Sequence, residues 1–139
     1  MKAVLDHVGI AVSNLDDALV FYRDALGLDV QEAEDIPSQR VRARFVSLGG
    51  STLELFEATS SDSPITRFLK RRGPGLHHVT LRVENINDAL GRLRERGIRL
   101  IDNSPRLGAG GSMVAFVHPA STQGVLVELK QVSNTAKEK

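Results

Sequence analysis

The chain has 139 residues, with 18 basic and 17 acidic side chains, so its net charge is about +1 and nothing in it calls for a polyanionic partner. Hydrophobic residues make up 41%, enough for a sizeable core, whereas aromatic residues make up only 4%, which disfavours nucleic-acid binders that stack bases. The absence of cysteine excludes a disulfide framework and thiolate chemistry.

The N-terminal residues have a strand-like pattern, and the C-terminal residues are polar. The first residues enter a strand pattern without a signal-peptide apolar region, and no apolar run reaches the length of a membrane span. We therefore expect a soluble, intracellular (cytoplasmic) protein with no membrane partner. The polar C-terminal segment, residues 133–139, is expected to be a frayed tail.

A strand around His7 is expected to lead into a helix that begins near Ser13 or Asn14 and ends near Gly27. The helix is indicated by apolar residues at i, i+3, i+4 and i+7: Leu15, Ala18, Leu19 and Tyr22. Three strand-like segments follow, at residues 29–34, 41–48 and 52–58, with a Gly49-Gly50 hairpin turn before the last.

A short helix over residues 65–72 is expected next, opened by Ser63-Pro64 and ended by Gly73. Its last turn carries the run Lys70-Arg71-Arg72. These cations either face the helix C-terminus or contact a phosphorylated substrate, and the sequence leaves both interpretations open.

The second half of the chain repeats the first. His78 follows His7 by 71 residues, and Asp88-Ala89-Leu90 follows Asp17-Ala18-Leu19 by the same distance. A second helix beginning near Asn85 or Asn87 and ending near Gly97 is followed by strand-like segments at 98–101, 112–118 and 124–131, with a glycine loop at 108–111. We predict an α+β fold of two tandem βαβββ modules, residues 1–73 and 74–132, which form a curved, mixed eight-stranded sheet around a metal cavity within one compact domain.

Strand alternation places four potential metal ligands on one face. His7 and His78 each point opposite the apolar residues of their strands, and Glu54 and Glu128 each lie between two apolar neighbours. A buried carboxylate needs a partner. One alternative is a divalent metal held by all four side chains. The other is ion pairing with Arg42, Arg44 or Arg82.

Two imidazoles and two carboxylates suit six-coordinate Co²⁺, Mn²⁺, Ni²⁺, Fe²⁺ or Mg²⁺ better than a structural Zn²⁺ site. Two open positions would accept a substrate that chelates through two oxygens, with the metal as a Lewis acid on a carbonyl. Of the other histidines, His77 is expected to be structural and to face away from the cavity. His118 could contact substrate or form a turn hydrogen bond.

The chain resembles the vicinal oxygen chelate superfamily and, within it, the methylmalonyl-CoA epimerases. The resemblance covers nearly the whole sequence and is carried by residues 5–12, 21–28, 63–65, 68–69, 75–79, 108–111, 116–119 and 124–129. It implies epimerisation of (R)- and (S)-methylmalonyl-CoA through a metal-stabilised enolate, with His7, Glu54, His78 and Glu128 as ligands of Co²⁺ or Mn²⁺. Ni²⁺, Mg²⁺, Fe²⁺ or Zn²⁺ are alternatives. It also implies an acyl-CoA substrate and a homodimer.

One departure from the family concerns the proton-transfer residues. Some members carry a Glu where this chain has Ala43, so Glu54 and Glu128 are expected to be both ligands and catalytic bases, one on each side of the substrate. Contacts to CoA could come from the glycine loop 108–111 or from Lys70-Arg71-Arg72, or the glycine loop could be a plain hairpin.

Three other functions are alternatives to epimerisation. A glyoxalase I-type lactoylglutathione lyase would use the same metal and the same two glutamates. A non-catalytic small-molecule (drug) binding protein of this fold usually lacks the His/Glu set and has more cavity aromatics. A ring-cleaving dioxygenase uses two histidines and one carboxylate, so the fourth ligand argues against it.

Overall fold

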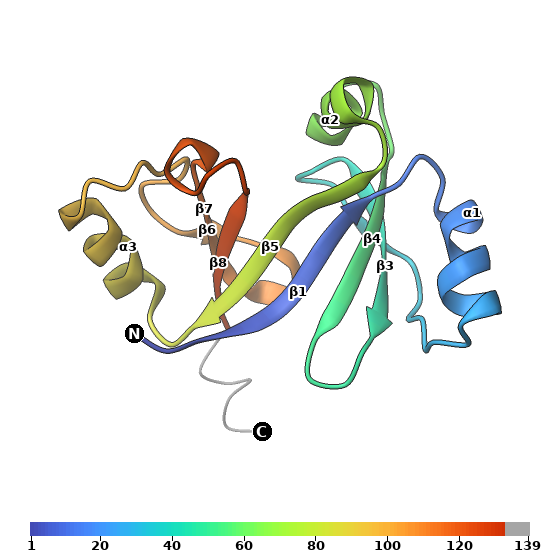
Figure 1. Ribbon diagram of the computed structural model, residues 1–139, viewed down its shortest axis with the longest axis horizontal. Helices are drawn as coiled ribbons and strands as arrows, with labels where there is room; N and C mark the ends of the chain where they lie inside the picture. Colours follow the sequence, from blue (N-terminus) through green and yellow to red (C-terminus); the bar gives the residue numbers. More distant parts are fainter. Residues whose placement is uncertain (133–139) are drawn as a thin grey trace. The chain divides into compact units, whose positions relative to one another are not determined.

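The computed structural model describes residues 1–132 (Figure 1). The segment 133–139, for which fraying was predicted, lies outside the described residues. The first half of the chain contains β1 (Ala3–Ala11), α1 (Leu15–Leu19), the π-helical turn η1 (Val20–Ala25), β2 (Glu34–Ile36), β3 (Val41–Ser47), β4 (Thr52–Ala58) and α2 (Pro64–Arg72). The second half contains β5 (Gly75–Val83), α3 (Ile86–Glu95), β6 (Arg106–Leu107), the 3₁₀ turn η2 (Ala109–Gly111), β7 (Met113–Val117), the 3₁₀ turn η3 (Pro119–Ser121) and β8 (Val127–Gln131).

The strands form one mixed sheet in the order β2-β3-β4-β1-β5-β8-β7-β6. β1 runs parallel to β4 and β5 runs parallel to β8, whereas β3 with β4 and β7 with β8 are antiparallel. Counted inward from each edge of the sheet, the strands follow the same order in the two halves, β2-β3-β4-β1 and β6-β7-β8-β5. This is the pattern expected of two copies of one βαβββ module. The predicted α+β class with tandem modules and a mixed eight-stranded sheet is therefore confirmed.

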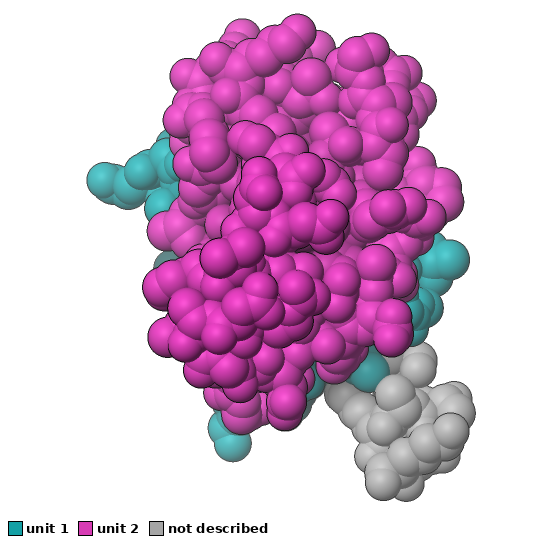
Figure 2. Space-filling model, turned by 90° about the vertical axis from the view of Figure 1, so that its right-hand side faces the viewer, with its two compact units in different colours: residues 1–6, 78–139 teal, residues 7–77 magenta. Residues whose placement is uncertain are grey.

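The chain divides into two compact units, which Figure 2 colours separately. One comprises residues 7–77, and the other comprises residues 1–6 together with the described part of 78–139. The boundaries fall inside β1 and β5, so each unit takes part of both strands. Within residues 1–132, no helix is both long and apolar enough to cross a membrane.

In the unit 7–77, α1 covers one sheet face. Asn14 caps this helix by accepting a hydrogen bond from the Asp17 amide at 3.0 Å, and Leu15 and Leu19 pack against Val46 and Leu55. The predicted helix continues past Leu19 as η1. On the opposite face, Ala11, Ala43 and Phe56 form a cluster with Ile65 of α2. Because neighbouring strand residues alternate, Leu55 belongs to one face and Phe56 to the other.

The other unit is built in the same way around α3. Asn85 caps this helix, accepting from the Asp88 amide at 3.0 Å, and Gly97 follows it at φ 74°, a conformation that favours glycine. Ile86, Ala89 and Leu90 of the helix pack against three residues of the sheet, Ala115, Val117 and Leu129. The predicted helix starts and stops are confirmed in both modules.

Two strand predictions were wrong in position. Residues 29–34 and 98–101 contribute only an isolated bridge each, Val30 to Val46 and Leu100 to Val117, and the edge strands β2 and β6 begin later. In the second module the physical reason is visible, because the Asp102 carboxylate accepts the Phe116 amide at 2.8 Å and replaces a backbone partner in the ladder. The hairpin at Gly49-Gly50 and the helix opened by Ser63-Pro64 are confirmed.

Candidate metal and catalytic site

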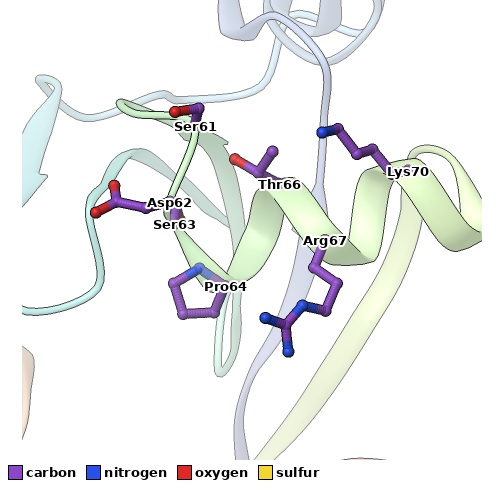
Figure 3. Close-up of a pocket in the computed structure, with 7 residues that line it drawn as sticks. All are labelled: Ser61, Asp62, Ser63, Pro64, Thr66, Arg67 and Lys70. Atoms are coloured by element: carbon purple, nitrogen blue, oxygen red, sulfur yellow. The ribbon is translucent and has the colours of Figure 1, made fainter.

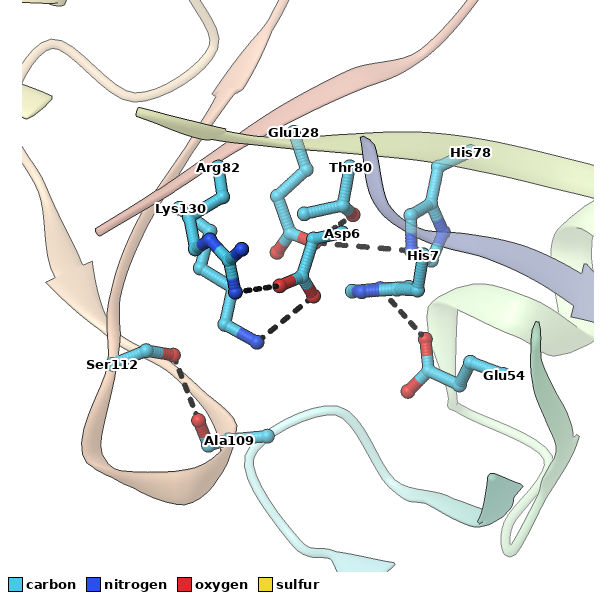
Figure 4. Close-up of polar contacts among 10 residues, drawn as sticks. All are labelled: Asp6, His7, Glu54, His78, Thr80, Arg82, Ala109, Ser112, Glu128 and Lys130. Atoms are coloured by element: carbon cyan, nitrogen blue, oxygen red, sulfur yellow. Dashed lines mark hydrogen bonds and ion pairs between the residues drawn. The ribbon is translucent and has the colours of Figure 1, made fainter. Parts of the chain in front are cut away.

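His7 and Glu54 lie together in the unit 7–77. β1 and β4 are adjacent and parallel, with Gly9 in register with Glu54. Leu53 and Leu55 pack toward α1, so Glu54 points to the opposite face. His7 Nε2 and Glu54 Oε1 are 3.4 Å apart, and both residues are buried (Figure 4). The structure thus brings one predicted imidazole and one predicted carboxylate to the same place.

His78 and Glu128 form the corresponding pair in the other unit. β5 and β8 are adjacent and parallel, with Thr80 in register with Glu128. His78 Nε2 lies 3.8 Å from Glu128 Oε1, and both residues are buried. The rings of Phe116 and His78 are nearly perpendicular with centroids 6.2 Å apart, so an apolar group borders the pair.

Thr80 is a further polar residue of this pair, to which the sequence assigned no role. Its hydroxyl donates to Glu128 Oε1 at 2.6 Å, and the residue is 0% exposed (Figure 4). Strand alternation could have indicated Thr80 from the sequence, because it places this residue on the same face as His78. What the sequence could not supply was the β5–β8 register, which sets Thr80 directly beside Glu128.

The arginines proposed as alternative partners of the two glutamates are engaged elsewhere. Arg42 binds Asp35 at 2.9 Å, and Arg44 donates to the Gln31 carbonyl at 2.7 Å. Arg82 lies 3.7 Å from Asp6, whose carboxylate also accepts from Lys130 at 3.0 Å. The predicted alternative, in which an arginine pairs with either glutamate, is therefore not what the described residues show. The sequence did not predict the Asp6 cluster.

The remaining histidines have structural contacts. The His77 ring makes T-shaped contacts with Phe56 and Phe68, with centroid distances of 5.3 and 4.9 Å. The His118 Nδ1 accepts the Ala120 amide at 2.9 Å and caps η3. Of the two predicted roles of His118, the turn hydrogen bond is therefore observed.

Two other segments bear on the predicted substrate contacts. Ala43 is fully buried beside Phe56, and its methyl side chain cannot carry a proton. The glycine loop 108–111 closes a turn in which the Gly108 amide donates to the Ser112 carbonyl at 2.8 Å and the buried Ser112 hydroxyl donates to the Ala109 carbonyl. The loop therefore has the bonds of a hairpin between β6 and β7.

A pocket of about 370 Å³ opens at the start of α2 (Figure 3). Its charged lining residues are Asp62, Arg67 and Lys70. The Ser60 hydroxyl, which donates to Asp62, and the Arg40 guanidinium hold the pKa of that carboxyl below its usual value. An anion at Asp62 weakens any preference of this pocket for phosphate. Lys70 and its two basic neighbours occupy the last turn of α2, as expected for cations at a helix C-terminus.

Comparisons with known proteins agree with this construction. Residues 6–116 match the family model of the Glyoxalase/Bleomycin resistance protein/Dioxygenase superfamily. The sequence is 44% identical over 128 residues to the mitochondrial methylmalonyl-CoA epimerase of Bos taurus, covering 91% of this chain and 73% of that protein. It is 40% identical to the ethylmalonyl-CoA/methylmalonyl-CoA epimerase of Cereibacter sphaeroides, covering 92% and 97%. A solved methylmalonyl-CoA epimerase in complex with methylmalonyl-CoA and NH₄⁺ superposes with a TM-score of 0.88 at 32% identity, covering 96% and 97%.

The chain therefore belongs to the glyoxalase/bleomycin resistance protein/dioxygenase superfamily, the vicinal oxygen chelate group that its motifs predicted. Within this superfamily, the predicted resemblance to the methylmalonyl-CoA epimerases is confirmed by relatives at 40% and 44% identity and by the superposed epimerase structure.

Proposed function

We propose that this protein interconverts (R)- and (S)-methylmalonyl-CoA by moving the proton at C2. The observation that carries the proposal is the pair of buried His–Glu contacts, one in each module, in a chain whose relatives at 40% and 44% identity are named as epimerases of this substrate. A proton α to a thioester is acidic enough to be removed by a carboxylate when the resulting enolate is stabilised.

A divalent ion fits the residues that are present. His7, Glu54, His78 and Glu128 offer nitrogen and carboxylate oxygen donors, the set that suits Co²⁺ or Mn²⁺, and we propose these four as its ligands. Within the unit 7–77 the structure brings together one nitrogen and one oxygen donor, His7 and Glu54, and within the other unit it brings together His78 and Glu128. When bound, the ion would polarise the thioester carbonyl as a Lewis acid.

The chain's own residues would transfer the proton. Glu54 is 7% exposed and Glu128 is 6% exposed, so both carboxylates are shielded from bulk water. Epimerisation requires that a proton leave one face of C2 and return to the other, and two carboxylates can each serve as base in one direction. Ala43 cannot take part in this exchange, which leaves the two glutamates as the proposed bases. We also propose a homodimer, as the family resemblance implies, and a cytoplasmic location, as expected for an intracellular protein.

The test is solvent exchange at C2 of methylmalonyl-CoA in D₂O with the Co²⁺-loaded protein. The expected result is deuterium incorporation together with interconversion of the two isomers. Turnover of the glutathione hemithioacetal of methylglyoxal, with no exchange at C2, would instead identify a lactoylglutathione lyase. Failure to bind any metal after repletion would exclude both enzymes and favour a binding protein of this fold.

A further inference from the structure

We infer that Thr80 is a positioning residue for Glu128 and that it makes the two proposed bases unequal. The inference rests on the proposed function, because it concerns how one of the two glutamates is held for proton transfer. Its structural basis is a hydroxyl-to-carboxylate hydrogen bond of 2.6 Å between two buried residues of the same unit.

The bond has the features of a strong, orienting contact. A donor–acceptor distance of 2.6 Å is typical of a hydroxyl that donates to an ionised carboxylate. Thr80 is 0% exposed, so water does not compete for its hydroxyl, and a β-branched side chain has few χ1 choices. The hydroxyl therefore fixes the direction of Glu128 Oε1. The second carboxylate oxygen is then directed as well, because the carboxylate is planar.

The first module has a glycine at the position equivalent to Thr80. Gly9 is in register with Glu54, just as Thr80 is in register with Glu128, so the two positions are equivalent in the two modules. Glycine has no side chain and cannot provide a hydroxyl at that position. The two modules thus share a histidine and a glutamate at equivalent positions but differ in the residue that is in register with each glutamate.

This asymmetry has a measurable consequence. If Glu128 takes the proton from one isomer and Glu54 from the other, loss of the Thr80 hydroxyl slows proton removal from one isomer only. Groups that orient a metal ligand or a base typically contribute roughly 10- to 100-fold to affinity or activity. We expect a loss of roughly tenfold in exchange from the isomer served by Glu128, and a change of less than about twofold for the other.

The experiment compares two matched pairs of proteins. Thr80→Val replaces the hydroxyl of the native residue with a methyl group of similar volume. Thr80→Ser and Thr80→Ala differ from each other only by the hydroxyl, so this pair serves if Thr80→Val does not fold. For each protein, the initial rate of deuterium wash-in at C2 is measured separately for (R)- and (S)-methylmalonyl-CoA at saturating Co²⁺. Calorimetric titration with Co²⁺ gives a second readout that is independent of turnover.

The exchange rate is expected to fall for only one of the two isomers. Thr80→Val and Thr80→Ala lose exchange from one isomer, Thr80→Ser keeps it, and Thr80→Ala binds Co²⁺ several-fold more weakly than Thr80→Ser. Equal losses for both isomers, no loss at all, or identical behaviour of the Ser and Ala variants would overturn the inference. Absence of exchange in the wild-type protein would overturn the proposed function, and this role of Thr80 with it.

Discussion

Glu54 and Glu128 are the two residues on which the proposed chemistry depends most directly. Each sits on the last strand of its module, and each is turned away from the helix by apolar neighbours that belong to the core. A glutamine at either position keeps an oxygen that can coordinate a metal, but it cannot accept a proton at neutral pH. The substitution therefore separates the ligand role from the base role.

For Glu54→Gln we expect metal to be retained and epimerisation to fall by roughly 10²- to 10⁴-fold, the usual contribution of a general base. The measurement is the rate of interconversion of the two isomers, with metal content determined on the same sample. Glu57→Gln is the matched control, since Glu57 lies on the same strand and faces Arg42 of β3 instead of a histidine. Full activity of metal-loaded Glu54→Gln would leave Glu54 as a ligand only.

At the scale of the element, the two helix starts are equivalent in sequence and in structure. Asn14 and Asn85 are 71 residues apart, and each accepts the amide three residues later at 3.0 Å. Replacing Asn85 with alanine leaves that amide at the start of α3 without its side-chain acceptor. We expect the free energy of unfolding to fall by about 1 kcal/mol, measured by urea denaturation.

Asn87→Ala is the control for this substitution. Asn87 is exposed in the first turn of the same helix but is not its cap, and alanine has the higher helix propensity. Its expected effect is neutral or slightly stabilising. A loss of stability equal to that of Asn85→Ala would show that the cap contributes nothing specific.

Two glycines of the second module are expected to respond oppositely to alanine. Gly91 lies within α3, and a Cβ there would meet nothing within 4 Å, so Gly91→Ala should stabilise the fold by about 0.5 to 1 kcal/mol. A Cβ on Gly108 would lie 2.8 Å from the Cγ1 of buried Val114. Gly108→Ala should therefore destabilise by about 1 to 3 kcal/mol, as other overpacked sites do. Thermal unfolding of both variants checks the opposite signs.

Elements with their own periodicity could be predicted from the sequence, whereas edge strands could not. The stripes at i, i+3, i+4 and i+7 located α1 and α3, and alternation put His7 and Glu54 on one face, because these patterns are local. β2 and β6 are only 3 and 2 residues long and pair on one side, so burial imposes little pattern on them. The role of Asp102 in replacing a ladder partner depends on a contact 14 residues away.

The site shows the same division between local and long-range information. Strand alternation and duplication together pointed to the two His–Glu pairs, whose atoms lie 3.4 and 3.8 Å apart within their units. Thr80 and the Asp6 cluster depend on strand register and on contacts between residues 48 and 124 positions apart. Binding of one ion by all four proposed ligands would involve both modules, so its test is the stability of the whole molecule with and without metal.

A metal that binds the folded chain and not the unfolded chain stabilises the whole molecule by an amount that grows with the logarithm of the metal concentration relative to its Kd. At a Co²⁺ concentration 100 times its Kd, the expected gain is about 2.7 kcal/mol, and removal by a chelator should lower the Tm by several degrees. The quantity to compare is the metal-dependent increment in Tm, since replacing buried His78 also lowers stability without metal. His78→Ala should abolish most of the increment, and His118→Asn, which keeps a hydrogen-bond acceptor in the η3 turn, should preserve it. Equal increments in these two variants would contradict the assignment of His78 as a ligand.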